Sequence, residues 1–320
     1  MKRVLVVDPI APAGMEFLAR RAEVVCAPDS APDTVRRLAR EADGIITRSK
    51  LPDDLFDAAP GVRAVSIHGT GIDLVPLEAA TARGVMISHL PGGNAQSVAE
   101  YCVMAMLMLA RNVTAITASL RQTHWDGARA LGADVHEIAG MTLGLVGVGA
   151  IGTRVARIAR NGFGMRVLGT QRRLDRLPAE AEPCSLEALI PASNFVVLTC
   201  PLNAQTHHLL NDRTLALMRR EAWLVNVGRG PVVDEAALID ALRERRIAGA
   251  MLDVYENYRL EPGHPLFCLD NVILTPHLSG MTRESRARMG VAAAEEMLRM
   301  LDGEAPRNFV NSQAVRVAHH

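Results

Sequence analysis

The chain has 320 residues, which is enough for two domains of ordinary size, each with its own hydrophobic core. Its 35 Lys and Arg residues equal its 35 Asp and Glu residues, so the formal net charge is zero. A balanced charge does not favour nucleic acid or an anionic membrane as a partner. Small molecules and further copies of the chain are therefore the expected partners.

The cysteines and the apolar runs bear on the cellular compartment in which the protein is expected. The five cysteines are scattered and form no CxxC pair, which argues against a disulfide framework and against a zinc site. The first apolar run, Val4–Val7, is too short for a secretory signal. The longest apolar run, Tyr101–Ala110, is half of the ~20 residues that cross a bilayer. We therefore expect a soluble, cytoplasmic protein that holds no metal.

The first third of the chain alternates short apolar segments with polar segments of helical character. The apolar segments are Val4–Val7, Val24–Cys26, Gly44–Thr47, Ala64–Ile67 and Val85–Ser88. This pattern is typical of a parallel sheet with helices between its strands. Pro91-Gly-Gly-Asn breaks the pattern, and the apolar segment Ala95–Arg111 after it predicts a helix that enters a second domain. The Tyr101–Ala110 face of that helix fits either core packing or a dimer interface.

The stretch LGLVGVGAIG, which starts at Leu143, predicts a buried strand that turns directly into a helix. In Gly147-x-Gly149-x-x-Gly152, the first glycine permits the tight turn, the second lets a pyrophosphate approach the backbone, and the third allows close packing of helix on strand. Ala150 and Ile151 begin the helix, whose N-terminus faces the anion. A second strand, Met165–Thr170, completes a βαβ unit that is typical of dinucleotide binding.

The end of that second strand bears on which dinucleotide is bound. NAD-binding domains usually carry an acidic residue about 20 residues after the glycines, where it accepts hydrogen bonds from the ribose. Here the chain reads Gln171-Arg172-Arg173, an amide followed by two guanidinium groups. Guanidinium groups suit a ribose 2′-phosphate, although a pair of solvated loop arginines is the other interpretation. We predict NADP as the preferred cofactor, with NAD as the alternative.

Four further strands and a last long helix complete the pattern. The strands are expected at Phe195–Thr199, Trp223–Val227, Gly249–Leu252 and Val272–Leu274. The helix, at about Arg283–Leu301, could return the chain to the first domain. The sequence therefore predicts an α/β fold with two doubly wound parallel-sheet domains. A Rossmann-type dinucleotide-binding domain, residues 95–282, is inserted in a discontinuous flavodoxin-like substrate or catalytic domain, residues 1–94 and 283–320.

Three of the predicted strands end in unusual polar residues. Arg229, Asp253 and His277 each follow an apolar strand of the second domain. Open α/β sheets bind their ligands at the carboxyl ends of the strands. A lone arginine or histidine at such a position is usually structural, but three polar residues behind a dinucleotide motif indicate an active site.

Over nearly its whole length, the chain resembles the D-isomer-specific 2-hydroxy-acid dehydrogenase family. The matching stretches are His68-Gly-Thr-Gly-Ile-Asp73, Asn94-Ala-Gln-Ser-Val-Ala-Glu100, the glycine motif, Asn226-Val-Gly-Arg-Gly230, Leu252-Asp-Val-Tyr255 and Thr275-Pro-His277. The resemblance implies an oxidoreductase that acts on CH–OH donors with NAD or NADP. It also implies a homodimer, a discontinuous substrate domain and an inserted nucleotide domain.

Side-chain chemistry and the resemblance together assign the catalytic roles. The planar guanidinium of Arg229 suits a substrate carboxylate, which it would hold by two parallel hydrogen bonds while polarising the adjacent carbonyl. His277 is the acid or base that exchanges a proton with the substrate oxygen. The backbone of Thr70 and Gly71, with the loop Arg48-Ser49, resembles the family's cradle for the substrate carboxylate.

The resemblance also implies cofactor contacts outside the glycine motif. Asp253 matches the family position that contacts the nicotinamide carboxamide, and Val227 lies in a cofactor-binding stretch. Cys200-Pro201, with Thr206 behind it, resembles the loop that covers the adenine side of the cofactor. A nucleophilic Cys200 would need a base beside it, and the sequence places none there, so we interpret Cys200 as packing.

One position departs from the family pattern. Family members usually carry a glutamate five residues beyond the aspartate of the Leu-Asp-Val motif, where it pairs with the histidine; here that position is Tyr258. A phenol can hydrogen-bond His277 but supplies no negative charge at neutral pH, so we expect a lower histidine pKa than in the family. Glu256 is the alternative partner. Tyr258 is therefore counted among the catalytic residues.

These features predict an NADPH-dependent reductase of a small 2-keto acid such as glyoxylate or hydroxypyruvate. A phosphoglycerate dehydrogenase-like enzyme is one alternative. A nucleotide-sensing binding protein with weak or no turnover is another. The presence of Arg229 and His277 argues against the sensor, whereas the loss of the glutamate argues slightly for it.

Overall fold

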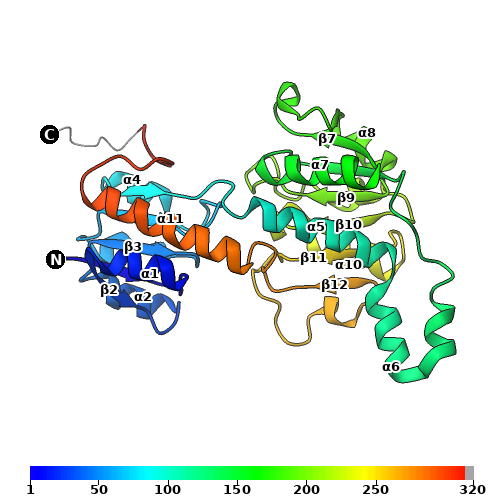
Figure 1. The fold of residues 1–320 in the computed structure, drawn as a ribbon, viewed down its shortest axis with the longest axis horizontal. Helices are drawn as coiled ribbons and strands as arrows, with labels where there is room; N and C mark the ends of the chain where they lie inside the picture. The colour runs from blue at the N-terminus through cyan, green and yellow to red at the C-terminus, as the bar shows by residue number, and fades with distance from the viewer. Residues whose placement is uncertain (314–320) are drawn as a thin grey trace. The chain divides into compact units, whose positions relative to one another are not determined.

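The computed structural model describes residues 1–313 and divides the chain into two compact units. Among the described residues, unit 1 consists of 1–94 and 281–313, and unit 2 consists of Ala95–Gly280. Each unit is built on one parallel β-sheet, which confirms the predicted α/β fold (Figure 1). Residues 314–320, which the prediction assigned to the substrate domain, lie outside the described residues.

Unit 1 contains a five-stranded sheet with the order β2-β1-β3-β4-β5. Its strands are β1 (Lys2–Val6), β2 (Ala22–Cys26), β3 (Gly44–Thr47), β4 (Ala64–Ile67) and β5 (Met86–Ser88). Its helices are α1 (Pro12–Ala19), α2 (Pro32–Ala39), α3 (Leu55–Ala58), α4 (Leu77–Ala82) and α11 (Arg283–Leu301). The strands pair in parallel, and their order is that of the flavodoxin-like fold, with its reversal between β1 and β3.

Two apolar layers cover the two faces of this sheet. Val4 and Ala64 are buried with Met297 on the face that α1 and α11 cover. Leu5 and Val65, the next residues along the same strands, are buried on the other face with α2, α3 and α4. Because neighbouring residues of a strand point to opposite faces, both must be apolar in a sheet that is covered on both sides.

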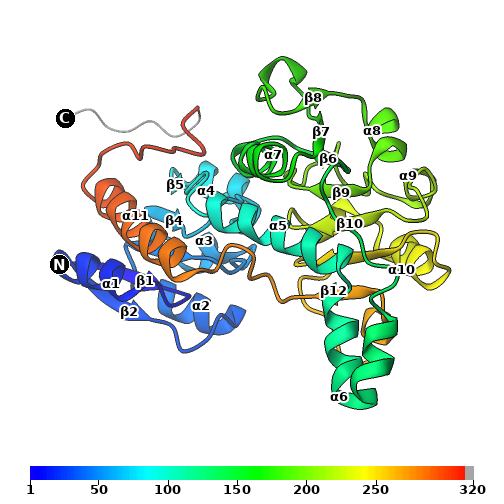
Figure 2. The same cartoon turned by 45° about the vertical axis from the view of Figure 1, so that its right-hand side comes forward.

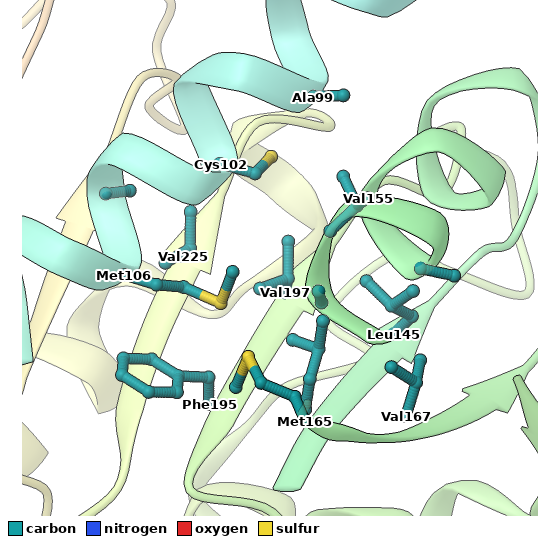
Figure 3. Close-up of a cluster of buried hydrophobic side chains, with 14 of the residues drawn as sticks. Ala99, Cys102, Met106, Leu145, Val155, Met165, Val167, Phe195, Val197 and Val225 are labelled. Carbon is teal, nitrogen blue, oxygen red and sulfur yellow. The ribbon is translucent and has the colours of Figure 1, made fainter. Parts of the chain in front are cut away.

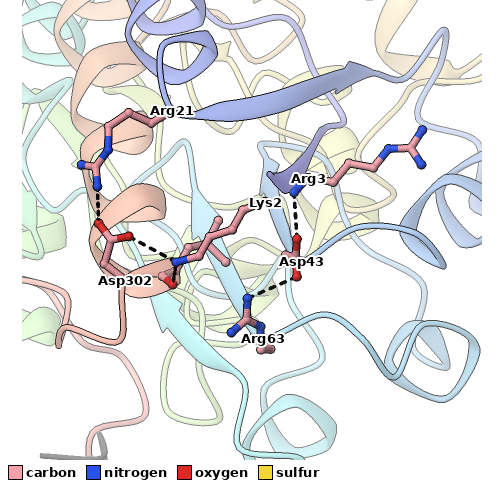
Figure 4. Close-up of polar contacts among 7 residues, drawn as sticks. Lys2, Arg3, Arg21, Asp43, Arg63 and Asp302 are labelled. Atoms are coloured by element: carbon pink, nitrogen blue, oxygen red, sulfur yellow. Dashed lines mark hydrogen bonds and ion pairs between the residues drawn. The ribbon is translucent and has the colours of Figure 1, made fainter. Parts of the chain in front are cut away.

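Ion pairs join the end of α11 to the start of the chain (Figure 4). Asp302 accepts from Lys2 Nζ at 3.2 Å and from Arg21 Nη2 at 2.6 Å. Nearby, Asp43 accepts from Arg63 Nη2 at 3.2 Å. Exposed pairs of this kind contribute ~0–1 kcal/mol each, so the buried face of α11 contributes more to holding the helix than these charges do.

Unit 2 contains a seven-stranded parallel sheet with the order β12-β11-β10-β9-β6-β7-β8. Its strands are β6 (Thr142–Val146), β7 (Arg166–Thr170), β8 (Glu182–Pro183), β9 (Phe195–Leu198), β10 (Trp223–Asn226), β11 (Gly249–Leu252) and β12 (Val272–Leu274). Its α-helices are α5 (Ala95–Ala110), α6 (Val113–Ala130), α7 (Ala150–Phe163), α8 (Leu186–Ala192), α9 (Asp212–Leu215) and α10 (Glu235–Arg243). Short 3₁₀ turns are η1 (Leu174–Arg176), η2 (Gly230–Val232) and η3 (Pro265–Cys268). The strand order reverses between β6 and β9, as in the Rossmann fold.

Helices α5 and α7 cover one face of this sheet, and α8, α9 and α10 cover the other. Figure 3 shows Cys102 and Met106 of α5 and Val155 of α7 packed in the first of these layers. Part of α5 is therefore core. Met104 and Leu107 of the same helix are exposed by 40% and 36%, and a dimer interface there stays a prediction.

The sequence pattern does not predict α6. Its backbone leaves the helical region at His124, with φ 60° and ψ −156°, so the element consists of two helical stretches. These stretches lie side by side and extend away from the sheet in Figures 1 and 2. Within residues 1–313 no single helix is long and apolar enough to cross a membrane. Only α5 and α6 taken together, bent by 51° where they meet, reach that length and composition.

Candidate active site

The glycine motif forms the turn between β6 and α7, where the strand order of the sheet reverses. Gly147 has φ 87°, and a Cβ there would stand 2.6 Å from the backbone of Cys200. A Cβ on Gly152 would stand 2.7 Å from the Gly147 carbonyl oxygen, whereas a Cβ on Gly149 would meet nothing within 4 Å. Backbone packing therefore requires the first and third glycines, and the space in front of the second is open.

The start of α7 offers donors to a ligand in that open space. Gly149 is the N-cap residue, and no side chain caps the helix. The N–H groups of the first turn, including those of Ala150 and Ile151, have no acceptor within the helix. An uncapped N-terminus beside a glycine turn binds phosphate groups. The residues present therefore fit the pyrophosphate of a dinucleotide.

The arginines after β7 differ in their surroundings. The Gln171 side chain donates to the Arg173 carbonyl at 2.8 Å, and the Arg173 guanidinium binds Asp175 at 2.9 Å. Arg172 is exposed, and among the described residues no hydrogen bond or ion pair engages its side chain. Asp175 therefore competes with any phosphate for Arg173, whereas Arg172 is available to an anion.

Cys200-Pro201 follows β9 beside the glycine turn. Cys200 is only 7% exposed, and burial raises the pKa of its thiol to about 11. A thiol that stays protonated at neutral pH is a poor nucleophile, which agrees with a packing role. Thr206 Oγ1 donates to the Pro201 carbonyl at 2.7 Å and accepts from Asn203 N at 2.8 Å, which closes this loop. Val227, after β10, is buried as well.

Asn226 shapes the loop that carries Arg229. This asparagine is 1% exposed, and its side chain donates to the Arg229 carbonyl and accepts from Gly228 N, both at 3.1 Å. Arg229 Nη1 donates to the Gly228 carbonyl at 2.9 Å. Gly230 lies so close to Tyr255 that a Cβ would overlap the tyrosine carbonyl. The loops after β10 and β11 are therefore in backbone contact.

Asp253, directly after β11, is fully buried, and its carboxylate binds the loop after β12. Oδ1 accepts from Thr275 Oγ1 at 2.7 Å and from Leu278 N at 2.8 Å, and Oδ2 accepts from Ser279 N at 2.9 Å. The Asp253 carbonyl accepts from His277 N at 2.9 Å. This carboxylate therefore holds the histidine loop, and its contact with a nicotinamide carboxamide stays a prediction.

The rings of His277 and Tyr258 are in contact. Their centroids are 5.8 Å apart, and the planes meet edge to face at 72°. Both residues have left-handed backbones, with φ 53° for His277 and 61° for Tyr258. Glu256, the alternative partner, places its carboxylate 3.2 Å from His208 Nε2. A phenol ring thus lies beside the histidine, as expected from the position of Tyr258 in the motif.

In unit 1 the Arg48-Ser49 loop lies where the strand order reverses, and Asp8 organises it. Asp8 Oδ2 accepts from Arg48 N at 2.8 Å and from Ser49 N at 2.9 Å, while Oδ1 accepts from Ser49 Oγ at 2.7 Å. The Arg48 guanidinium contacts only the weak acceptor Met281 Sδ, at 3.0 Å, within residues 1–313. The backbone N–H groups of the loop therefore donate to Asp8, whereas the Arg48 guanidinium is available to bind an anion.

Thr70 and Gly71 follow β4, the neighbour of β3, so their loop lies next to that of Arg48. Thr70 Oγ1 donates to the Leu90 carbonyl at 3.2 Å. His68, just before them, is 7% exposed, and neither ring nitrogen has a partner among the described residues. Burial, assisted by the charge of Arg48, lowers the pKa of His68 to about 4, so this ring is neutral at pH 7.

The candidate residues divide between the two units. Arg48, Ser49, Thr70 and Gly71 belong to unit 1, and the other candidates belong to unit 2. Within unit 2 they follow parallel strands of one sheet and so share its carboxyl edge. Among residues 1–313, no group of three or more His, Cys, Asp or Glu side chains could hold a metal ion, and the five cysteines are free.

Three residues that shape these loops were not predicted to do so from the sequence: Asp8, Asn226 and Thr275. Asp8 follows a buried strand, and Asn226 ends one. Arg229 was identified by such a position, but the sequence pattern assigns no role to Asp8 or Asn226. Thr275 belongs to the Thr275-Pro-His277 motif, in which the sequence predicts a role only for His277.

The sheet of unit 2 is doubly wound, and the glycine turn lies where its strand order reverses. An arginine and a histidine lie at the same edge of the sheet. Together these features define a dinucleotide-dependent oxidoreductase. The profile of the D-isomer specific 2-hydroxyacid dehydrogenase NAD binding domain matches residues 103–279. The chain belongs to the D-isomer specific 2-hydroxyacid dehydrogenase family, whose members are NAD(P)-dependent and act on CH–OH donors.

Individual relatives cover nearly the whole chain. A glyoxylate reductase of Aeropyrum pernix is 37% identical over 98% of this chain and 97% of its own. A D-3-phosphoglycerate dehydrogenase of Methanocaldococcus jannaschii is 34% identical over 97% of this chain but only 60% of its own. The crystal structure of an NADPH-dependent glyoxylate/hydroxypyruvate reductase from Sinorhizobium meliloti, in complex with NADP and malonate, has a TM-score of 0.88. It is 30% identical and covers 100% of this chain and 99% of its own.

Proposed function

We propose that the protein is an NADPH-dependent reductase of small 2-keto acids of the glyoxylate or hydroxypyruvate type. The observation that carries the proposal is the His277 loop, which Asp253 holds at the same sheet edge as the glycine turn and Arg229. The substrate class is supported by the relatives named as glyoxylate reductases, one of which is described as NADPH-dependent.

The chemistry of each side chain suits this reaction. When bound, the reduced nicotinamide supplies the hydride that reaches the keto carbon. Arg229 holds the substrate carboxylate through its planar fork and stabilises negative charge on the neighbouring oxygen. His277 donates a proton to that oxygen, and in the reverse direction it removes the proton. In unit 1 we propose that Arg48-Ser49, Thr70 and Gly71 bind substrate carboxylate.

The preference for NADPH is proposed to rest mainly on Arg172. Replacing Arg172 by alanine is expected to lower kcat/KM for NADPH by about tenfold or more and to leave NADH unaffected, because a charge-assisted hydrogen bond contributes ~1.5–3 kcal/mol. The same exchange at Arg173 is the matched control and should have a smaller effect, since Asp175 already binds that side chain. Steady-state kinetics with both cofactors measure this. Equal losses for NADPH and NADH in Arg172→Ala would contradict the assignment.

Tyr258 is proposed to set the pH range of the reaction. Reduction requires the protonated imidazole, so the rate falls as the pH rises through the pKa of His277. A glutamate at position 258 would place a negative charge beside the ring and raise that pKa. We therefore expect Tyr258→Glu to move the fall in kcat to higher pH, by about one pH unit. Tyr258→Phe is the uncharged control. A Tyr258→Glu profile that coincides with the wild-type profile would exclude coupling between positions 258 and 277.

A turnover assay tests the proposed function directly. Purified protein is mixed with NADPH, and separately with NADH, against glyoxylate, hydroxypyruvate, pyruvate and phosphohydroxypyruvate, and the loss of the reduced nicotinamide is followed. Fastest consumption of NADPH with glyoxylate or hydroxypyruvate is the expected result. A clear preference for phosphohydroxypyruvate would favour the phosphoglycerate dehydrogenase-like alternative. Binding of both cofactors without turnover of any acid would favour the nucleotide-sensing alternative.

We also propose a cytoplasmic homodimer. Exposed apolar side chains on α5 and α6 support the dimer, since Met104, Leu120 and Trp125 are exposed by 40%, 45% and 66%. Burial of such exposed apolar side chains against a second copy would be favourable. The five free cysteines fit a reducing compartment.

A further inference from the structure

Helix α5, one face of which packs in the core of unit 2, carries a hydroxyl that contacts the histidine loop. Tyr101 is 7% exposed, and its hydroxyl contacts Thr275 Oγ1. Thr275 Oγ1 also lies 2.7 Å from Asp253 Oδ1. A carboxylate oxygen only accepts, so the single hydroxyl proton of Thr275 goes to Asp253. Tyr101 must then donate its own proton to Thr275, which gives a directed chain from Tyr101 through Thr275 to Asp253.

This chain ends on the loop that presents His277. Asp253 accepts hydrogen bonds from two backbone N–H groups that follow His277, at 2.8 and 2.9 Å. On the other side of the histidine, the Tyr255 hydroxyl donates to the Thr275 carbonyl at 2.8 Å. His277 itself has φ 53°, a backbone conformation that a residue other than glycine keeps only when its surroundings fix it. The loop is therefore held on both sides of the histidine.

The Tyr101 hydroxyl is well suited to act as a permanent donor. Burial raises its pKa well above the usual range, so the group stays protonated at neutral pH. The ring packs in the same apolar layer as Cys102 and Met106. A phenylalanine would satisfy that packing equally well, so the hydroxyl is the part of the side chain that packing does not explain.

We propose that Tyr101 is a positioning residue for catalysis: its hydroxyl fixes Thr275 and Asp253, and through them the orientation of the His277 imidazole. Hydrogen bonds in such a buried chain polarise one another, so removing the first donor weakens the later ones. The inference rests on the proposed function, because His277 is the proton donor of that function. It adds a residue of the core helix to the machinery of the reaction.

The first test exchanges single hydroxyl groups. Tyr101→Phe is expected to lower kcat on the order of tenfold, within the range by which hydrogen-bonded neighbours couple, and to change KM for the 2-keto acid less than twofold. Met106→Leu, a core exchange in the same helix, is the matched control and should leave both constants unchanged.

Thr275→Val should lower kcat at least as much as Tyr101→Phe does, and Thr275→Ser, which restores the hydroxyl, should recover most of that loss. The double variant Tyr101→Phe/Thr275→Val should be no slower than Thr275→Val alone. Additive losses would overturn the proposal.

The second test reads His277 without turnover. Protein labelled with ¹⁵N-histidine gives ring signals for its ten histidines, and the His277 signal is the one absent in His277→Asn. Tyr101→Phe should shift the His277 ring signal and its titration midpoint, whereas Met106→Leu should not. A His277 signal and midpoint that match wild type in Tyr101→Phe would overturn the positioning role. If wild type reduced no 2-keto acid, the proposed function would fail, yet this measurement would still decide whether Tyr101 orients His277.

Discussion

Replacing His277 by asparagine is expected to lower kcat for 2-keto acid reduction by about 10²–10⁴-fold, the usual contribution of a positioned acid or base. Asparagine is the suitable replacement because it tolerates a left-handed backbone better than most residues, and position 277 has φ 53°. The dissociation constant for NADPH, measured by fluorescence titration, should stay within about twofold, since the glycine turn and the β7 end are untouched.

The control for this exchange is His124→Asn in α6. It makes the same substitution at another histidine with positive φ, 60°, outside the candidate site. Kinetics of the control should match wild type. A His277→Asn variant that retained more than about a tenth of the wild-type kcat would remove His277 from the role of proton donor and leave the reaction without an assigned acid.

Gly230→Ala is expected to produce the largest loss of stability, about 3 kcal/mol of unfolding free energy. The added Cβ would overlap the Tyr255 carbonyl and stand 2.5 Å from Glu256 N, and backbone atoms on both sides leave no flexible side chain to move away. The two loops that carry Arg229 and Tyr258 would be forced apart. Activity should therefore fall together with the midpoint of thermal unfolding.

Gly162→Ala is the matched control for that prediction. Gly162 lies in α7 of the same unit, and a Cβ there would meet nothing within 4 Å. Since alanine favours a helix over glycine by about 1 kcal/mol, this variant should be unchanged or slightly more stable. Thermal unfolding followed by circular dichroism compares the two variants. Equal midpoints for Gly230→Ala and wild type would mean that the loops can separate at no cost.

The strands could be predicted from the sequence because both faces of each sheet are covered. A strand buried on both sides reads as a largely apolar run, and Gly44–Thr47, Ala64–Ile67 and Gly249–Leu252 begin and end where the structure places them. Helix α6 lacks such a pattern because most of its residues face solvent rather than a core, with Trp125 as an example. Periodicity arises from burial on one side, so it does not reveal an element that is exposed all round.

The role of a site residue could be predicted from the sequence where its side chain acts directly on a ligand. Arg229 and His277 stand out because charged or titratable residues rarely follow apolar strands without a function. Contributors that act through a partner carry no such signal. Tyr101 reads as a core residue of an apolar helix, and its hydrogen-bond partner Thr275 lies 174 residues away in the sequence. Asp8 likewise acquires its role only when β1 and β3 pair and bring Arg48 beside it.

The discontinuity of unit 1 affects the order in which the protein is completed during synthesis. All five strands of its sheet, and the whole of unit 2, leave the ribosome before α11 does. Helix α11 supplies Ala293, Met297 and Leu301 to the apolar layer that covers one face of that sheet. Until the helix emerges, this face of the nascent sheet lacks much of its cover, whereas unit 2 already has every residue that it needs. Late in synthesis, this apolar face is therefore exposed to non-native contacts of the kind that lead to aggregation.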